Sequence, residues 1–223
     1  MLALFFILLI KSFNLKFSSI FEAINYKQIM IDTSFTFLRV TGSALVAWFL
    51  GIFAGYSFYK FSIVKKIGLD SVNFFRHISP YALLPFAIIW FGLGEIPLFF
   101  IMFIALFSPS LVASNDIFST IDKSYIEEAA VLGSDILNTF LHIEIPIAAF
   151  SLLNQFRIIW GLGWATVIAA EMLGVKNGLG SRLLDFRYLL QYPQMIQYLL
   201  IMGITGIFID KILVKVAQRF LYE

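Results

Sequence analysis

Residues 125–146 read YIEEAAVLGSDILNTFLHIEIP, a polar stretch that interrupts the long apolar segments of this 223-residue chain. Gly133 stands near its middle, and glycine often ends a helix because it adopts positive φ without steric cost. Ser134 or Asp135 can cap a second helix directly afterwards. The sequence therefore predicts two short helices that meet at a glycine elbow, one over residues 119–132 and one after the glycine.

Apolar side chains lie on both predicted helices of this elbow. In the first helix they form one stripe at helical spacing, which consists of Ile121, Tyr125, Ala129 and Leu132. In the second helix, which runs up to Pro146 at the start of the next apolar segment, they are Ile136, Leu137, Phe140, Leu141, Ile143 and Ile145. Because residues 116–146 are too polar for the hydrocarbon core of a membrane, these side chains need something to dock against. We therefore expect the elbow to bind another protein.

The rest of the chain has the composition of an integral membrane protein. Hydrophobic residues make up 60% of it and charged residues 13%, against about 25% charged residues in an average soluble domain. The mean hydropathy is +0.89, and 26 phenylalanines suit a surface that lipid solvates. We expect one all-α domain over residues 1–223, a polytopic helix bundle in the lipid bilayer.

The composition disfavours several classes of function. A net charge of +2 without a basic run gives no sign of nucleic-acid binding. The chain has no cysteine, and His77 and His142 lack metal-ligand spacing, so we expect neither a disulfide framework nor a metal site. A membrane-embedded enzyme would need paired carboxylates, a Ser/His/Asp set or metal ligands, but within the predicted spans only Arg157 and Glu171 stand out. A structural scaffold would not need a glycine elbow with docking residues.

Five apolar stretches are candidate membrane spans, at residues 35–58, 81–93, 96–112, 148–175 and 195–213. The second and third are short and close together, which predicts a tight hairpin. Residues 1–10 are also apolar, but ten residues make about 15 Å of helix, half of a hydrocarbon core of about 30 Å. Either the first span is genuinely shortened, or the start codon of the chain is mis-assigned. The bundle therefore has five or six transmembrane helices.

The distribution of basic residues gives an orientation. Placing residues 60–76, Lys123 and the end of the chain inside puts eight basic residues there and leaves six outside. The bias is small, but cytoplasmic segments of membrane proteins do carry an excess of basic residues. The elbow and the C-terminus are therefore expected on the cytoplasmic side.

The elbow also carries residues at a recognisable spacing: Glu127-Glu128-Ala129, Gly133 after three further residues, Ile143 after nine more, and Ile145-Pro146 after one more. This spacing resembles the EAA loop of ABC importer permeases, which reads E-A-A, three residues, G, nine residues, I, one residue, L-P. Two positions differ, because Glu128 replaces the first alanine and Ile145 replaces leucine. By this loop the chain is identified as a member of the type I, binding-protein-dependent permeases.

The resemblance covers most of the chain. Residues 79–95, 156–164, 169–171 and 178–180 are similar to segments of the branch that carries nitrate, sulfonates and taurine, and the similarity runs from about residue 34 to about residue 214. This branch implies a small anion as substrate, such as nitrate, an alkanesulfonate, taurine or bicarbonate. Pyrimidine precursors of thiamine are the alternative, because similar permeases carry them.

The resemblance further implies a mechanism and a set of partners. Two permease copies, expected to be identical, would enclose a pathway through the bacterial cytoplasmic (inner) membrane. Two ATPase subunits would each hold one elbow, and an extracytoplasmic binding protein would deliver the substrate. ATP and Mg would be bound by the ATPase, since this chain has no GxxxxGK[ST] loop; it is expected to be no enzyme and to hold no cofactor. The coupling residues would be Glu127, Glu128, Ala129, Gly133, Ile136, Leu137, Phe140, Ile143 and Pro146.

One face of the span over residues 148–175 is a candidate translocation pathway. Helical spacing places these side chains on it: Asn154, Arg157, Gly161, Trp164 and Glu171. Arg157 would either attract an anionic substrate or tie the span to a carbonyl or carboxylate of a neighbouring helix. Glu171 would be either a gate or a water-facing carboxylate at a helix end. Arg39, near one end of its span, is expected to extend its charge to the membrane interface.

The elbow is unusually acidic for a cytoplasmic segment. Six of the 14 acidic residues lie within residues 116–144, and only Lys123 opposes them. The segment therefore either meets a basic rim on the ATPase or is an ordinary solvated face.

Overall fold

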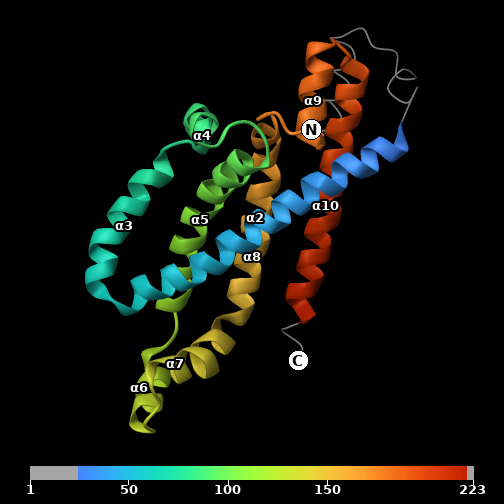
Figure 1. The fold of residues 1–223 in the computed structure, drawn as a ribbon. Helices are drawn as coiled ribbons and strands as arrows, with labels where there is room; N and C mark the ends of the chain where they lie inside the picture. Colours follow the sequence, from blue (N-terminus) through green and yellow to red (C-terminus); the bar gives the residue numbers. More distant parts are fainter. Residues whose placement is uncertain (1–24, 220–223) are drawn as a thin grey trace.

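The structure, a computed structural model, describes residues 25–219, and every regular element in that range is helical (Figure 1). The helices are α2 (Tyr26–Lys60), α3 (Ser62–His77), η2 (Pro80–Leu83), α4 (Leu84–Phe91), α5 (Glu95–Ser119), α6 (Lys123–Val131), α7 (Ile136–Thr139), η3 (Phe140–Glu144), α8 (Ile145–Glu171), α9 (Leu179–Tyr188) and α10 (Tyr192–Arg219). The all-α fold predicted from the sequence is confirmed. The predicted span over residues 1–10 lies outside the described residues.

Within the described residues, three helical stretches are long and apolar enough to cross a membrane. They are α2, α5 and the continuous run Ile136–Glu171, which comprises α7, η3 and α8. Helix α10 has 28 residues, a comparable length, but Asp210 and Lys211 lie within it. The chain is therefore a membrane helix bundle, as its composition predicts.

Two of the predicted span boundaries are wrong. The stretch predicted over residues 81–93 forms only η2 and α4, which together make about 20 Å of helix, less than the thickness of a hydrocarbon core. The stretch predicted over residues 96–112 continues in α5 to Ser119. Polar residues did not end this helix, because Ser114 and Asn115 are buried against neighbouring helices.

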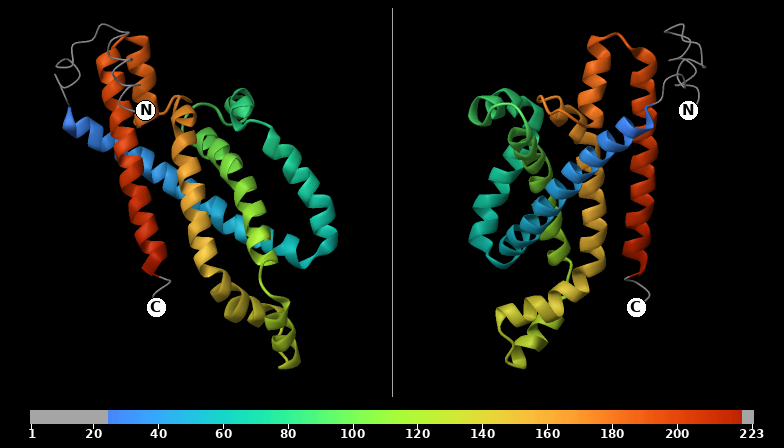
Figure 2. Two further views of the ribbon diagram at one scale, coloured as in Figure 1. Left: turned by 180° about the vertical axis from the view of Figure 1, so that it is seen from behind. Right: turned by 45° about the vertical axis from the view of Figure 1, so that its right-hand side comes forward.

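Helix α2 crosses α5 and α8 at close range, as the ribbon views show (Figures 1 and 2). Glycines on α2 permit this approach. A Cβ at Gly51 would lie 2.6 Å from the Ser110 Cβ, and one at Gly55 would lie 2.6 Å from the Leu111 carbonyl oxygen. Small residues allow membrane helices to pack backbone against backbone, so this crossing fixes α2 against α5.

The bundle has two distinct ends. Helices α6 and α7 project at the same end as the carboxyl end of α10, whereas α9 and the start of α10 form a hairpin at the opposite end (Figure 2). The elbow and the carboxyl end of α10 thus lie at the same end of the bundle. We refer below to the elbow end and the hairpin end.

Candidate functional site

The elbow has the local structure that the sequence predicts. Gly133 has φ +82°, and Asp135 caps α7 by accepting a hydrogen bond of 2.9 Å from the Asn138 amide. Of the two candidate caps, Asp135 is therefore the one used. The first helix begins later than predicted, because Asp122 accepts a hydrogen bond of 3.0 Å from the Ser124 amide and so starts α6 at Lys123. Hydrogen bonds from Ser124 hold the pKa of the Asp122 carboxyl below its ordinary value.

Large apolar side chains are exposed on both arms of the elbow. On α7, Ile136 is 58% exposed and Leu137 is 63% exposed. At the end of α6, Val131 and Leu132 are each 87% exposed. An apolar surface of this kind outside a membrane bundle marks an interaction site. Sequence reasoning missed Val131, because that residue lies outside the apolar stripe.

Two hollows flank the glycine of the elbow. One, of about 650 Å³, lies between α7 and α2 and is lined by Phe53, Tyr56, Ser134, Asp135, Ile136, Leu137 and Phe140. The other, of about 450 Å³, lies on α6 and is lined by Ser124, Glu127, Glu128, Val131 and Leu132. The first hollow is mainly apolar, and the second combines apolar side chains with two carboxylates. A partner that filled both would need apolar side chains and a basic group.

Two of the predicted coupling residues are buried within this chain. Ala129 is 4% exposed and Phe140 is 7% exposed. The Phe140 ring lies 4.2 Å from the Tyr56 ring on α2 and 6.0 Å from the Phe118 ring on α5, measured between centroids. The expectation that Phe140 is displayed to a partner is therefore wrong. It anchors the elbow to the bundle instead, which depends on packing that the local sequence does not reveal.

The second arm of the elbow joins the following span without a break. Helix α7 passes through η3, one π-helical turn, directly into α8, and Pro146 stands in the first turn of α8 as expected. Ile143 is half-buried, whereas Glu144 is completely buried. Sequence reasoning gave Glu144 no role beyond its contribution to the acidic charge of the segment.

The five candidate pathway residues on α8 do not share one open face. Asn154 and Gly161 are exposed and Arg157 is half-exposed, but Trp164 and Glu171 are buried. The Trp164 indole donates a hydrogen bond of 3.2 Å to the Met202 carbonyl, and so it ties α8 to α10. Helical spacing places residues around a helix correctly, but it does not show which neighbouring helix covers them.

Arg157 forms a two-pronged ion pair with Asp210 on α10. Its Nε lies 2.6 Å from Oδ1, and its Nη2 lies 2.9 Å from Oδ2. Of the two interpretations of Arg157, a tie to the carboxylate of a neighbouring helix is therefore the one the structure shows. The pairing offsets the positive charge that would attract an anion, and the arginine fork matches the carboxylate geometry closely.

At the hairpin end, Arg39 is buried between two carboxylates. It is 3% exposed, and its guanidinium donates to Glu95 at 2.5 and 2.8 Å, to Glu171 at 2.8 Å and to the Asn177 carbonyl. The prediction that Arg39 extends to the membrane interface is therefore wrong. A buried charge is retained where partners and hydrogen bonds compensate for the loss of water, and here both carboxylates lie far away in the sequence.

Glu171 is fully buried and holds the turn that leads into α9. It accepts hydrogen bonds from the Thr36 hydroxyl at 2.8 Å and from the Gly180 amide at 2.7 Å. The interpretation of Glu171 as a water-facing carboxylate is therefore wrong. Gly178 has φ +143°, and a Cβ there would lie 2.5 Å from the Glu171 Cδ, so glycine is required for both conformation and space.

Asp32, which sequence reasoning missed, completes this network. It is fully buried and accepts hydrogen bonds from the Gly178 amide at 3.2 Å, the Arg182 Nε at 3.2 Å and the Tyr198 hydroxyl at 3.0 Å. The network thus fastens α2 to α5, α8, α9 and α10. One signal could have found it, since Asp32, Thr36 and Arg39 recur at three- or four-residue spacing on a helix that is mainly apolar.

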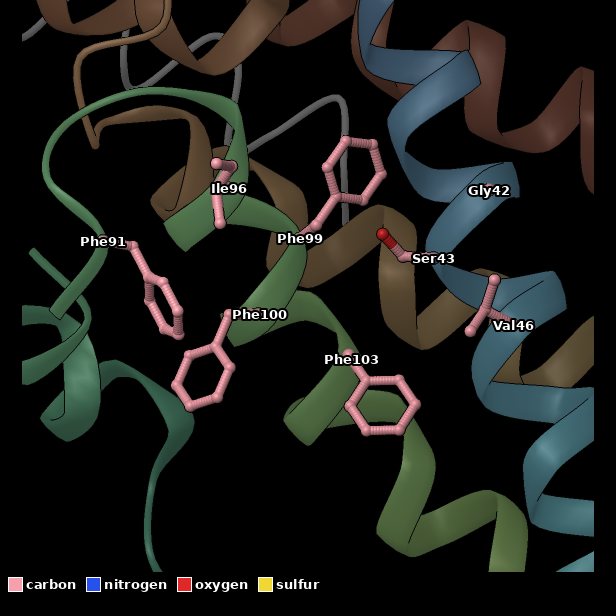
Figure 3. A pocket seen from close by; sticks show the side chains of 8 residues that line it. All are labelled: Gly42, Ser43, Val46, Phe91, Ile96, Phe99, Phe100 and Phe103. Atoms are coloured by element: carbon pink, nitrogen blue, oxygen red, sulfur yellow. The ribbon is translucent and has the colours of Figure 1, made fainter.

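A hollow of about 480 Å³ lies on the flank of α2 and α5 (Figure 3). It is lined by Gly42, Ser43, Val46, Phe91, Ile96, Phe99, Phe100 and Phe103. Ser43 is the one polar side chain in this set, and it lies on the α2 side of the hollow in Figure 3. The lining offers no charge and no group of donors, so this hollow is unsuited to a charged solute.

The bundle, with a glycine elbow projecting from one end, defines a membrane-embedded permease. The family model described as "Binding-protein-dependent transport system inner membrane component" matches residues 47–222, most of the chain. The protein belongs to this family, whose members are permease subunits of ABC transporters.

Several known proteins are similar to the chain. The probable ABC transporter permease protein BMEII0107 of Brucella melitensis is 31% identical over 192 residues, which cover 86% of this chain and 78% of that one. The taurine transport system permease protein TauC of Escherichia coli is 28% identical over 64% of this chain and 52% of its own. The nitrate import permease protein NrtB of Leptolyngbya laminosa is 25% identical over 79% and 62%.

The fold also matches a solved transporter. The inward-facing MetNI methionine ABC transporter has a chain that superposes with a TM-score of 0.73, covering 88% of this chain and 99% of that one. The sequence identity is 15%, so this likeness concerns the fold alone. It supports the description of the chain as a permease bundle.

Proposed function

We propose that this chain is the transmembrane subunit of an importer that moves a small anion across the bacterial inner membrane by alternating access, driven by separate ATPase subunits. The observation that carries the proposal is the elbow at Gly133, which displays Ile136, Leu137, Val131 and Leu132 outside the bundle. ATP and Mg²⁺ would be bound by the ATPase subunits. When these close on ATP, the elbows would move with them and re-orient the pathway.

The assembly we infer contains two copies of this chain, two ATPase subunits and one extracytoplasmic binding protein. The elbow would lie in the cytoplasm together with the carboxyl end of α10, and the α9–α10 hairpin would lie on the opposite side. Two features support this arrangement: both docking arms project from one end of the bundle, and the family is named for dependence on a binding protein.

The substrate we infer is a small anion such as nitrate, an alkanesulfonate, taurine or bicarbonate. The support comes from the names of similar permeases, one for taurine and one for nitrate. Arg157 contributes less than the sequence suggests, because Asp210 offsets its charge. Asn154 and Gly161, the two candidate pathway residues of α8 that are exposed, remain the proposed pathway lining, and selectivity would reside largely in the binding protein.

Reconstitution in proteoliposomes tests the proposal. The chain would be purified with the ATPase and binding protein encoded beside it, and uptake of labelled taurine, nitrate, bicarbonate and a thiamine-precursor pyrimidine would be measured with and without ATP. We expect uptake that requires both ATP and the binding protein. Uptake that persists without ATP would refute the proposed function, and uptake of a thiamine-precursor pyrimidine instead would overturn the substrate class.

The docking role of the elbow has its own test. Ile136→Asp and Leu137→Asp should each abolish co-purification of the ATPase subunit, because a charge would be buried at the contact. Leu189→Asp is the matched control, since Leu189 is 64% exposed but directly follows α9, in the hairpin of α9 and α10. Retention of the ATPase by both elbow variants would show that it docks elsewhere.

A further inference from the structure

Helix α3 runs from the elbow end of the bundle to the hairpin end. The end of α2, which precedes it, packs at the elbow, since the Tyr56 ring lies 4.2 Å from the Phe140 ring between centroids. Helix α4, which follows it, packs at the hairpin end, where Ala87 shares a buried cluster with Ile101 and Leu173. Between these two points α3 lies beside α5, one of the membrane-spanning helices (Figures 1 and 2). Its 16 residues make about 24 Å of helix, so α3 occupies much of the depth of the membrane.

Helix α3 carries a polar stripe along one face. Four polar or charged residues recur at intervals of four, three and four, which places them within about 60° of each other around the helix. We call these residues the α3 stripe, and all four are exposed: Lys66, Asp70, Asn73 and His77. Gly68 lies nearly opposite, where a Cβ would collide with the Phe58 ring of α2, so the stripe points away from α2. The expectation that residues 60–76 all lie on one side of the membrane is therefore wrong.

The α3 stripe is unsuited to lipid. A charged side chain within a membrane is costly and faces water or protein instead. On α8, Arg157 meets this need by pairing with Asp210. Neither Lys66 nor Asp70 lies in an ion pair within residues 25–219. The stripe therefore needs either water or a second protein surface.

Symmetry favours water over a dry contact between two copies. In the proposed assembly both elbows lie on the same side of the membrane, so the two-fold axis follows the membrane normal and equivalent residues lie at equal depth. A dry contact between two α3 stripes would bring each Lys66 near its own equivalent. Two like charges without water repel each other strongly and lose their hydration as well.

We propose that the α3 stripe lines the aqueous translocation pathway, and that Lys66 supplies the charge that attracts the anion there. The exposed charges of α3 are Lys66 and Arg76 against Asp70, an excess of one positive charge for each copy, and a wall of this sign raises the local concentration of anions. Lys66 thus provides what Arg157 loses to Asp210. This inference rests on the proposed function, because it names residues of the same pathway.

Single cysteines test whether the stripe meets water. The chain has no cysteine of its own, so an introduced thiol reports on its position alone. Asn73→Cys lies in the stripe, and Ser71→Cys is the matched control, since Ser71 is also exposed but lies on the half of α3 that carries Gly68. In proteoliposomes, a membrane-impermeant thiol reagent applied to both sides should modify Asn73→Cys about tenfold faster, because the reactive thiolate forms in water and not in an apolar environment. Mass spectrometry of this chain gives the two rates.

Charge variants test the attraction of the anion. With substrate below saturation, Lys66→Gln should lower the initial rate of ATP-dependent uptake about two- to fivefold, since one water-exposed charge interacts weakly with its partner. Lys66→Arg should restore the rate, and Asp70→Asn should not lower it. Lys65→Gln is the matched control, because it removes the same charge from the neighbouring residue, which is half-buried and lies about 100° away from Lys66 around the helix. All four variants should retain the ATPase subunit on purification.

Several results would overturn the inference. Asn73→Cys that is not modified, or is modified no faster than Ser71→Cys, would show that the stripe does not face a pathway. Uptake by Lys66→Gln at the parent rate, an equal loss with Lys65→Gln, or loss of the ATPase subunit with Lys66→Gln would exclude the role of Lys66 in attracting the anion. Absence of ATP-dependent uptake in the parent complex would instead refute the proposed function, whereas the thiol rates would still show whether the stripe meets water.

Discussion

Replacement of Gly178 by alanine tests the buried network at the hairpin end. The new Cβ would lie 2.5 Å from the Glu171 Cδ, so the carboxylate would have to move. Glu171 accepts hydrogen bonds from Thr36, Arg39 and Gly180, and it cannot leave one without disturbing the others. The substitution therefore acts on α2, α8 and α9 at once, although it adds a single methyl group.

The magnitude follows from two contributions. A non-glycine residue at φ +143° carries a strain of about 1–3 kcal/mol. Displacing the Glu171 carboxylate from one charged hydrogen bond costs about 1.5–3 kcal/mol more. Gly174 provides the matched control, because it has φ +85° but an added Cβ would meet the Leu93 Cβ at an ordinary 3.6 Å. Gly174→Ala should therefore show the backbone strain of a positive φ without the displacement of a buried carboxylate.

The assay is thermal unfolding of the purified permease in detergent, followed by tryptophan fluorescence. For a chain of this size a loss of 1 kcal/mol lowers the melting temperature by about 2–4 °C. Gly178→Ala should melt on the order of 10 °C below the parent protein and clearly below Gly174→Ala. Equal melting temperatures for the two alanine variants would refute the claim that Glu171 fills the space beside Gly178.

Three further predictions concern the ion pair, the acidic elbow and its cap. Arg157→Gln and Asp210→Asn should each lower the yield of folded permease, because each leaves one charged group unpaired. The double variant should recover part of the lost yield. A normal yield of Arg157→Gln without uptake would favour the substrate role of Arg157 instead. If the elbow meets a basic rim, raising salt from about 0.1 M to about 1 M, which shortens the Debye length from about 10 Å to about 3 Å, should release the ATPase subunit; salt-independent association would exclude that rim. The lowered pKa of the Asp122 carboxyl means that its capping contribution is present above the ordinary carboxyl pKa and is lost as pH falls through the lowered value. The protection of the α6 amides against hydrogen exchange, measured relative to an unfolded chain at the same pH, should therefore fall in acid. In Asp122→Asn, which caps without titrating, this protection should not fall in acid, and a fall as large as that of the parent protein would contradict the cap.

Features set by neighbouring residues could be predicted from the sequence. The positive φ of Gly133 and the cap at Asp135 depend on a few adjacent positions, and the structure has both. The membrane class follows from composition, which no packing detail alters. The family follows from the spacing that begins at Glu127 and ends at Pro146.

Features set by distant contacts could not be predicted. Arg39 lies 56 residues from Glu95 and 132 from Glu171, and periodicity along one helix does not show such partners. The burial of Phe140 depends on how α2 and α5 approach the elbow, and hydrophobicity alone suggests exposure to a partner equally well. The π turn that ends at Glu144 has no sequence signature, so sequence reasoning treated this residue as one more surface charge.

The glycine crossing of α2 over α5 has a consequence for chain length. Gly51 fixes α2 against α5, while Arg39, twelve residues earlier, fixes the same helix to α8. Twelve residues of helix span about 18 Å, and each added residue rotates the helix by about 100°. Inserting one residue between them would turn either the glycine or the arginine away from its partner. This stretch of α2 is thus a spacer of fixed length.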